Sequence, residues 1–350
     1  MRSYKNLWSK FISFDNLIDA FYKARKLKTH KQSIQRYTYD LETYIFRLQQ
    51  ELESDSFNVG KYHKFKIYEP KERIIKSLPF KDRVVQHALI NVIESIFDKS
   101  FIYDSYACRK GKGASLGINR IKIALKNQFK EGGYCLKGDI KKYFSSVDQN
   151  VLKEIIIKKI KDKRLLNIIY KIIDSDHSEF GITKGIPIGN LTSQLFANIY
   201  LNELDQFVKN KLNIKLYFRY MDDFIILSNS KKELRQYLNL INYFISNSLK
   251  LEMPYRKRTI FRIKDGVDFI GYKFFSRYIR LRRKNLMRFI KRTEKRIKQN
   301  NNQLLISSIN SWFGYSLQAN TINLNKIIFE TNFKEYNYLL NKQLNKIASY

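Results

Sequence analysis

Apolar residues recur at helical spacing in two stretches near the start of the chain. Within residues 14–53 the two series are Leu17, Phe21, Ala24 and Leu27, and then Leu41, Ile45, Leu48 and Leu52. Residues three and four positions apart share one face of a helix, so each series forms an apolar stripe beside a polar face. The pattern therefore predicts two amphipathic helices over residues 14–53.

A hairpin and a helix are predicted next along the chain. Residues 62–75 alternate around Pro70-Lys71, which predicts two strands joined by a turn at that dipeptide. A helix should follow from Lys81 through Phe97, where the apolar residues return to helical spacing.

Short apolar segments predict the remaining strands. YCLKGDI at residues 134–140 predicts a strand that ends in Asp139, and DFIGYKFF at residues 268–275 predicts another. LYFRYMDDFIIL at residues 216–227 is apolar on both sides of an acidic pair, as in a buried hairpin. Helices are expected at residues 148–173, 191–212, 231–248 and 280–298, and from there toward the end of the chain. Strands interleaved with helices predict an α+β fold.

Basic residues outnumber acidic residues about two to one. The chain has 66 Lys plus Arg and 32 Asp plus Glu, a net charge of 66 − 32 = +34. A charge of this size exceeds what solubility requires and favours a polyanionic partner such as nucleic acid. A nucleotide-biased genome would also enrich lysine, but such a bias alone would not halve the acidic residues.

The chain carries no signal for membrane insertion or secretion. No run approaches the roughly 20 apolar residues that span a bilayer, and the start MRSYKNLWSKFISFDN lacks the apolar core of a signal peptide. We therefore expect a soluble, cytoplasmic protein. Cys108 and Cys135 are isolated and only 4 His are present, which disfavours a zinc site or a disulfide framework.

The adjacent acids Asp222 and Asp223 lie inside an otherwise apolar segment. Burying two like charges costs free energy unless cations neutralise them. Neighbouring side chains of a strand point to opposite faces, so only a tight turn would bring both carboxylates to one cation cluster. Asp139 could supply a third carboxylate, and such a set can hold two Mg²⁺ ions about 3.5–4 Å apart. An exposed hairpin turn is the simpler explanation for an isolated Asp-Asp dipeptide.

Several motifs follow one another in the order found in reverse transcriptases. YMDD at residues 220–223 resembles their catalytic tetrapeptide, and LKGDIKKYF at residues 136–144 resembles their first palm motif. YEPKERIIKSLPFKDRVVQHAL at residues 68–89 resembles their fingers motif, and GVDFIGYKF at residues 266–274 resembles the primer grip. A single tetrapeptide is a weak signal, but the ordered set is a strong one.

The resemblance covers nearly the whole chain and implies a right-hand polymerase. It implies an N-terminal helical extension at residues 1–60, fingers and palm at 61–275, and a basic helical thumb at 276–350. The palm sheet would carry the catalytic aspartates, and the thumb would lie along a template–primer duplex.

The resemblance also assigns the metal ions and the catalytic residues. It implies an RNA-directed DNA polymerase with two Mg²⁺ ions, for which Mn²⁺ is a substitute. The implied metal ligands are Asp139, Ile140, Asp222 and Asp223. Lys257 in the segment RKRT resembles the lysine that protonates the departing pyrophosphate, although MPYRKRT is one residue longer than the usual form. Arg258 stays charged and cannot serve as an acid.

Further side chains are implied to select the nucleotide. Phe144, five residues after Asp139, resembles the aromatic residue that packs under the sugar and excludes a 2′-hydroxyl. Arg73 is the first candidate to clamp the triphosphate, with Lys71 and Arg83 behind it, because an Arg fork matches phosphate oxygens. The alternatives are a core aromatic for Phe144 and solvated surface charges for the three basic residues.

The segment GIPIGNLTSQ at residues 185–194 departs from the Gln-Gly-x-x-x-Ser-Pro pattern of most related reverse transcriptases. Ile188 and Gly189 stand at its first two positions and Gln194 at its last. The substituted pattern resembles enzymes of diversity-generating retroelements, which make error-prone cDNA of a template repeat. These three residues are therefore expected to bind the substrate.

The implied partners are a template or noncoding RNA, an RNA–DNA duplex and deoxynucleoside triphosphates. The retroelement resemblance adds a small basic helical accessory protein, and a second reverse transcriptase is the alternative protein partner. Defence-associated reverse transcriptases share these motifs, so both biological systems stay open, with the retroelement favoured. The alternative from a different functional class is a protein of the same fold that binds RNA as a scaffold and has no catalytic activity.

Overall fold

The structure is a computed structural model that describes residues 3–68, 72–176, 181–336, 338 and 341. The chain forms two compact units, each built from three separate segments. The first unit comprises Met1–Arg109, Gly138–Lys215 and Tyr237–Arg258, and the second comprises Lys110–Lys137, Leu216–Gln236 and Thr259–Tyr350. Across the described part of the chain, no helix is long and apolar enough to cross a bilayer.

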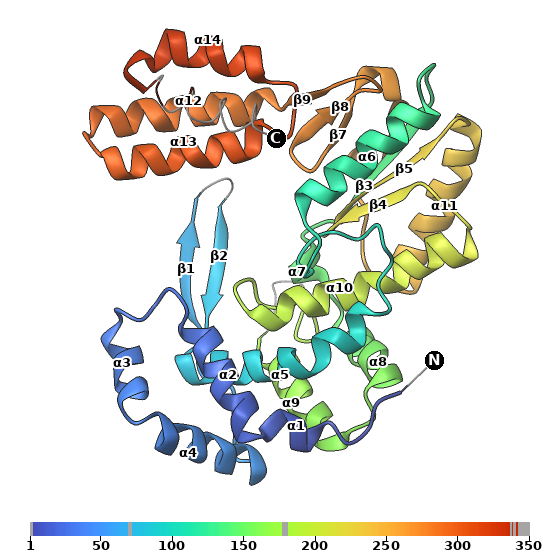
Figure 1. Cartoon of the computed structure of the whole chain (residues 1–350). Helices are drawn as coiled ribbons and strands as arrows, with labels where there is room; N and C mark the ends of the chain where they lie inside the picture. Colours follow the sequence, from blue (N-terminus) through green and yellow to red (C-terminus); the bar gives the residue numbers. More distant parts are fainter. Residues whose placement is uncertain (1–2, 69–71, 177–180, 337, 339–340, 342–350) are drawn as a thin grey trace. The chain divides into compact units, whose positions relative to one another are not determined.

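Four helices begin the first unit. They are α1 (Trp8–Ile12), α2 (Phe14–Arg25), α3 (Gln32–Tyr39) and α4 (Leu41–Glu53). Leu17, Phe21 and Ala24 are buried on α2, which packs along α5 (Phe80–Asp98) (Figure 1). Leu27 is 86% exposed because α2 ends before it, at Arg25. The two helices predicted over residues 14–53 form as α2 and α4, but the prediction missed α3, which lies between them.

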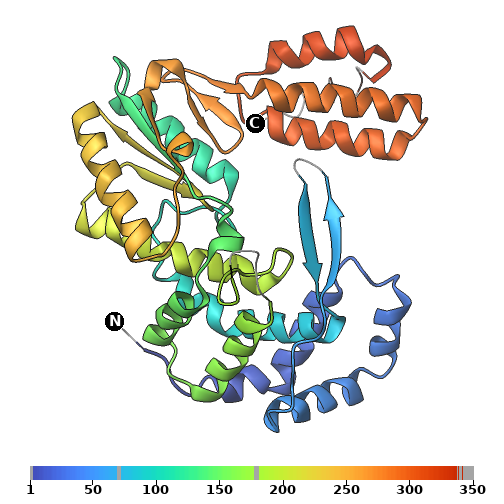
Figure 2. The same ribbon diagram turned by 180° about the vertical axis from the view of Figure 1, so that it is seen from behind.

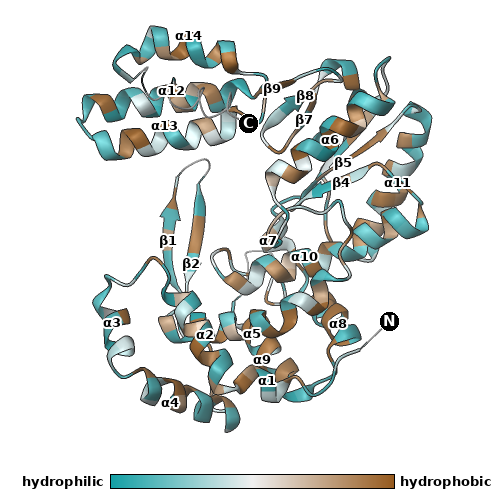
Figure 3. Ribbon diagram, viewed as in Figure 1, coloured by the Kyte–Doolittle hydropathy of each residue, from teal (hydrophilic) through white to brown (hydrophobic). Residues whose placement is uncertain are grey.

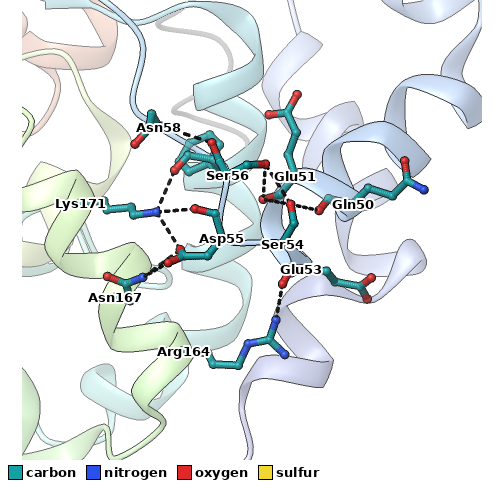
Figure 4. Close-up of polar contacts among 11 residues, drawn as sticks. Gln50, Glu51, Glu53, Ser54, Asp55, Ser56, Asn58, Arg164, Asn167 and Lys171 are labelled. Atoms are coloured by element: carbon teal, nitrogen blue, oxygen red, sulfur yellow. Dashed lines mark hydrogen bonds and ion pairs between the residues drawn. The ribbon is translucent and has the colours of Figure 1, made fainter.

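The turn after α4 is anchored to α9 (Lys163–Asp174) by charged and polar side chains (Figure 4). The Asp55 carboxylate accepts hydrogen bonds from Lys171 Nζ at 2.7 Å and from Asn167 Nδ2 at 2.9 Å. The hydrogen bond from Lys171 lowers the pKa of the Asp55 carboxyl. Arg164 Nη2 donates to the Glu53 carbonyl oxygen at 2.7 Å. These contacts join the N-terminal helices to the rest of the first unit.

The predicted hairpin is confirmed as β1 (His63–Ile67) paired antiparallel with β2 (Arg73–Ser77). Its expected turn at Pro70-Lys71 lies outside the described residues. The helix predicted after it is α5, whose apolar side chains are buried on most of its faces.

The single helix expected at residues 148–173 is two helices, α8 (Gln149–Lys159) and α9. Asp162 caps the start of α9, because its carboxylate accepts from the Leu165 backbone N–H at 3.2 Å. A second helix therefore begins at Lys163, although the apolar pattern of the sequence predicted one continuous helix there. The next helix, α10 (Leu191–Gln206), extends through a π-helical turn (Phe207–Lys211) and matches the expected helix at residues 191–212.

The second unit contains a four-stranded sheet with the order β4-β5-β3-β6. Its strands are β3 (Tyr134–Asp139), β4 (Tyr217–Tyr220), β5 (Asp223–Ser228) and β6 (Thr259–Arg262). β4 and β5 form the predicted hairpin, and β3 pairs antiparallel with β6. The last two residues of β3, Gly138 and Asp139, belong to the first unit. The helix α6 (Ala114–Gln128), which the sequence pattern did not predict, precedes β3 in the chain. The helix α11 (Lys231–Asn247), which it did predict, follows β5, and its residues from Tyr237 onward belong to the first unit.

The segment DFIGYKFF is two strands rather than the single strand expected. β7 (Val267–Phe269) and β8 (Tyr272–Phe274) pair antiparallel, and β9 (Ile279–Leu281) adds to β8. Ile270 and Gly271 form the turn with φ of 47° and 89°. Positive φ at both central residues is the geometry of a tight hairpin turn, which reverses the chain in mid-pattern.

Three helices follow, side by side in both ribbon views (Figure 1, Figure 2). They are α12 (Arg283–Lys298), α13 (Asn302–Ser316) and α14 (Ile322–Asn332). Phe289 of α12 stacks on Trp312 of α13 with ring centroids 4.2 Å apart, and Phe313 stacks on Phe329 of α14 at 5.2 Å. These rings give the three helices a core of their own.

Candidate active site

Asp222 and Asp223 lie at the tip of the β4–β5 hairpin, where Met221 and Asp222 make the turn. Met221 has a φ of 57°, which is unfavourable for a residue with a side chain. The fully buried Arg219 supports this turn, because its Nη1 donates to the Met221 carbonyl oxygen at 3.0 Å. The hairpin therefore has the tight turn that both carboxylates would need.

The strands on either side of this turn are almost entirely buried. Four apolar residues flank it with exposures of 1% or less: Tyr217, Phe218, Phe224 and Ile225. Asp222 and Asp223 themselves are half-buried. Figure 3 shows the hydrophobic colours along β5. The buried residues on both strands thus fix the position of the half-buried acidic turn.

Asp139 lies in the first unit, and the structure brings Lys257 to it. The Lys257 ammonium forms an ion pair with Asp139 Oδ1 and lies 3.4 Å from the Ile140 carbonyl oxygen. Lys257 ends a short 3-10 turn, Tyr255–Lys257, within the MPYRKRT segment. Of the basic residues in that segment, Lys257 is therefore the one that reaches the predicted catalytic carboxylate.

The chemistry of these oxygens suits a cation. A carboxylate and a main-chain carbonyl are hard oxygen ligands of the kind that Mg²⁺ takes, and here they hold the positive ammonium of Lys257. Among the described residues, no three His, Cys, Asp or Glu side chains gather in one group that could hold a metal ion. Asp139 and Ile140 belong to the first unit, and Asp222 and Asp223 belong to the second.

Phe144 lies in α7 (Tyr143–Ser146), a single helical turn that follows β3 in the chain. Its side chain is half-buried, and its ring meets that of Tyr143 edge-on with centroids 5.7 Å apart. The buried Tyr143 hydroxyl donates to the Ala197 carbonyl oxygen of α10 at 2.6 Å. The Phe144 carbonyl oxygen accepts from the Ile186 backbone N–H at 2.8 Å, which ties α7 to the segment that carries Ile188.

Ile188 and Gly189 are docked against strand β2. The Lys76 backbone N–H donates to the Ile188 carbonyl oxygen at 2.9 Å. Gly189 has a φ of 124°, and a Cβ placed there would lie 2.6 Å from the Lys76 carbonyl oxygen. Only glycine can combine this backbone conformation with so close an approach. The segment at residues 185–190 therefore lies between α7 and the basic hairpin.

Side chains strengthen the same docking. Asn190 Nδ2 donates to the Tyr62 hydroxyl at 2.9 Å, and the Leu191 backbone N–H donates to Gln86 Oε1 of α5 at 3.2 Å. The Lys76 ammonium forms an ion pair with Asp176, and both side chains are mostly buried. The sequence did not predict these contacts, because nothing in the spacing of Tyr62, Lys76 and Asn190 along the chain signals long-range pairing. Gln194, by contrast, is exposed on α10.

The residues predicted to bind phosphate are Arg73, Lys71 and Arg83. Arg73 is exposed at the start of β2, whereas Lys71 lies outside the described residues. Arg83 is half-buried on α5, with its guanidinium carbon 5.7 Å from the centre of the Phe80 ring. Burial lowers the pKa of Arg83, and its Nε finds no hydrogen-bond partner within the described part of the chain. Of the two described residues, Arg73 is the one that lies exposed on the hairpin.

Comparison with known proteins places this chain among the polymerases. Residues 63–274 match the family described as "Reverse transcriptase (RNA-dependent DNA polymerase)". Protein YkfC of Escherichia coli (strain K12) is 26% identical over 242 residues, covering 58% of this chain and 64% of that protein. Group II intron-encoded protein LtrA of Lactococcus lactis subsp. cremoris is 26% identical over 293 residues, covering 65% of this chain and 47% of that protein. The chain thus spans less than two thirds of the length of either relative.

A solved structure of apo telomerase from Candida Tropicalis has a TM-score of 0.48 and 13% identity, covering 66% of this chain and 58% of that one. The family match alone spans more than half of the chain and includes every predicted site residue. With the mixed helices and sheets described above, it confirms the α+β, right-hand polymerase fold. The chain belongs to the reverse transcriptase family.

Proposed function

We propose that this protein is an RNA-directed DNA polymerase that copies a dedicated structured RNA into cDNA. The observation that carries the proposal is the family match over residues 63–274, in which the carboxylates of the YMDD hairpin and Asp139 are all present. The supporting observation is the net charge of +34, which suits a template RNA and an RNA–DNA duplex.

Reverse transcriptases generally use Mg²⁺, and the residues that would hold it are Asp139, Ile140, Asp222 and Asp223. Two ions bound there would supply Lewis-acid chemistry, which would activate the 3′-hydroxyl of the primer and stabilise the leaving pyrophosphate. Asp222, in the turn itself, is the more direct ligand of the acidic pair, and Asp223 supports it. Mn²⁺ would be a substitute.

The remaining side chains bind and orient the nucleotide or move a proton. Arg73 binds the triphosphate, with Lys71 and Arg83 assisting. Phe144 fills the space beside the 2′ position and so selects deoxynucleotides. Lys257 donates a proton to the departing pyrophosphate, a role that the permanently charged Arg258 cannot perform. The half-buried Phe144 and the exposed Arg73 are compatible with these roles.

The biological system we propose is a diversity-generating retroelement with a small basic accessory protein. The Ile188-Gly189 pair supports it, because an apolar side chain stands where related enzymes carry a Gln amide. Antiphage defence with a noncoding RNA or a second reverse transcriptase is the other candidate. An accessory gene beside paired template and variable repeats in the genomic neighbourhood would favour the retroelement, and a noncoding RNA without such repeats would favour defence.

Primer extension on an RNA template tests the polymerase activity. Asp139→Ala and Asp222→Ala should each reduce DNA synthesis by about 1,000-fold or more, since several kcal/mol of transition-state stabilisation would be lost. RNA binding should stay near the wild-type level, because the basic surface is untouched. Asp265→Ala, at an exposed aspartate, is the matched control and should extend primers normally. Appreciable synthesis by either active-site variant would remove the catalytic assignment, and a wild-type protein that binds RNA without synthesis would favour a scaffold.

A further inference from the structure

The oxygens proposed to bind a metal ion already hold a cation that belongs to the chain. Asp139 Oδ1 pairs with the Lys257 ammonium, and the Ile140 carbonyl oxygen lies 3.4 Å from the same nitrogen. A lysine ammonium carries one charge and cannot act as a Lewis acid, but it neutralises a carboxylate as a bound ion would. The chain itself therefore supplies a counter-charge to Asp139.

The backbone that carries Lys257 is fixed beside this site. The Lys141 backbone N–H donates to the Glu252 carbonyl oxygen at 2.9 Å, and Met253 is 3% exposed. The Lys257 backbone N–H donates to the Pro254 carbonyl oxygen at 2.9 Å and closes the 3-10 turn. These contacts hold the start of the lysine side chain near Asp139 whether or not the ammonium is bound there.

The lysine side chain itself is free to change direction. It is 43% exposed, whereas that of Asp139 is 27% exposed. Four flexible carbons separate the ammonium from the backbone, so the charge can leave Asp139 without any movement of the 3-10 turn. An exposed ion pair of this kind is weak, which makes the exchange for a stronger cation feasible.

We propose that Lys257 is a resident counter-cation of the metal site, displaced from Asp139 and Ile140 when a divalent cation binds. The inference rests on the proposed polymerase function and adds a second role to the lysine that would act as proton donor. Metal binding would release the ammonium, so Lys257 becomes available to the substrate only in the metal-loaded site. The same competition weakens metal binding to the free protein and prevents an uncompensated negative charge at Asp139.

Divalent cation affinity of the free protein tests the competition directly. Mn²⁺ binding to the full chain, without nucleotide or nucleic acid, is followed by the electron paramagnetic resonance signal of free Mn²⁺. Lys257→Met should lower the dissociation constant at least about fivefold, because a repelling unit charge a few ångströms away is removed.

A matched control separates occupancy of the site from a general change in charge. Lys141 lies two residues after Asp139, but its ammonium pairs with Glu252 at 2.7 Å instead. Lys141→Met removes the same charge and should change Mn²⁺ affinity less than about twofold, since exposed charges are screened. If Lys257→Met binds Mn²⁺ no more tightly than Lys141→Met, the proposal is wrong.

A second measurement uses the unaltered protein and so avoids any folding defect of a variant. Acylation of individual lysines by an amine-reactive ester, read by mass spectrometry, should become about threefold or more faster at Lys257 when Mg²⁺ is added, because the ammonium leaves its ion pair. Lys141 in the same sample should keep its rate. An unchanged or slower rate at Lys257 would overturn the proposal.

These outcomes are distinguishable from failure of the polymerase assignment. If the unaltered protein extends primers but Lys257→Met binds Mn²⁺ with unchanged affinity, the polymerase assignment stays intact and only the counter-cation role is removed. Absence of primer extension and of Asp139-dependent Mn²⁺ binding would remove both.

Discussion

The two hairpins that carry predicted site residues are built in opposite ways. β4 and β5 have buried residues at seven of their ten positions and lie in a four-stranded sheet. β1 and β2 form a two-stranded sheet by themselves, and four of the five β1 residues are exposed. The β4–β5 hairpin presents two acids at its turn, whereas the strands of the β1–β2 hairpin carry four Lys or Arg residues and no acid.

The difference indicates a rigid element and a movable one. Burial fixes the β4–β5 turn even though Met221 has an unfavourable φ of 57°. An isolated two-stranded hairpin is marginally stable in water, so β1–β2 depends on its base, where Lys76 bonds to Ile188. This contrast suits the proposed roles, because metal ligands need fixed positions, while a clamp for phosphates needs to open and close.

Hydrogen exchange should show the largest contrast between the hairpins. Backbone amides of β1 (His63–Ile67) should exchange at least about a hundredfold faster than those of β5 (Asp223–Ser228), because local opening costs less where few side chains are buried. Peptide-resolved exchange measured by mass spectrometry gives the ratio. Equal protection of both strands would contradict the distinction between a rigid and a movable hairpin.

Gly189→Ala should break the docking of the 185–190 segment on β2. The new Cβ would meet the Lys76 carbonyl oxygen at 2.6 Å, and forced overpacking costs about 1–3 kcal/mol. Primer extension should therefore fall about tenfold to a hundredfold. Gly113→Ala is the matched control, because Gly113 has nearly the same φ, of 121°, but no atom lies within 4 Å of its added Cβ. Equal effects of the two substitutions would mean that backbone conformation, not the contact with β2, matters.

Phe144→Ala should admit ribonucleotides by opening space beside the 2′ position. The ratio of ribonucleotide to deoxynucleotide incorporation should rise about tenfold or more, since a removed steric contact is worth a few kcal/mol. Deoxynucleotide use should change little, because the α7 backbone keeps its bond to Ile186. Single-nucleotide incorporation assays measure both rates, and an unchanged ratio would reduce Phe144 to a packing residue.

Ile188→Gln should have the smallest effect and the most specific one. A Gln amide can hydrogen-bond near the nascent base pair, and one such neutral bond is worth about 0.5–1.5 kcal/mol, or up to roughly tenfold in discrimination. Misincorporation opposite template adenine should fall more than opposite the other bases. Sequencing of cDNA from both proteins on one template gives the comparison, and identical error spectra would defeat this role for Ile188.

Local patterns predicted most elements but missed several boundaries. The β4–β5 hairpin, β3 and α5 follow the expected ranges because each has a continuous apolar or periodic signal. Two predictions were wrong: the single helix at residues 148–173 and the single strand at residues 268–275. In each case the apolar pattern continues along the sequence, but a helix cap or a turn divides the element in two. The roles of the site residues stay predictions, and so do the three regions that divide the chain at residues 60 and 275.

The sequence by itself determined the polymerase motifs, their order and the acids at a hairpin turn, because these features are local and each is carried by neighbouring residues. The tertiary structure decided which distant residues meet. It placed the Lys257 ammonium, rather than Arg256 or Arg258, against Asp139, and it set Gly189 against the Lys76 backbone. Such contacts depend on how separate segments pack, and packing is a property of the whole fold that no residue spacing along the chain encodes.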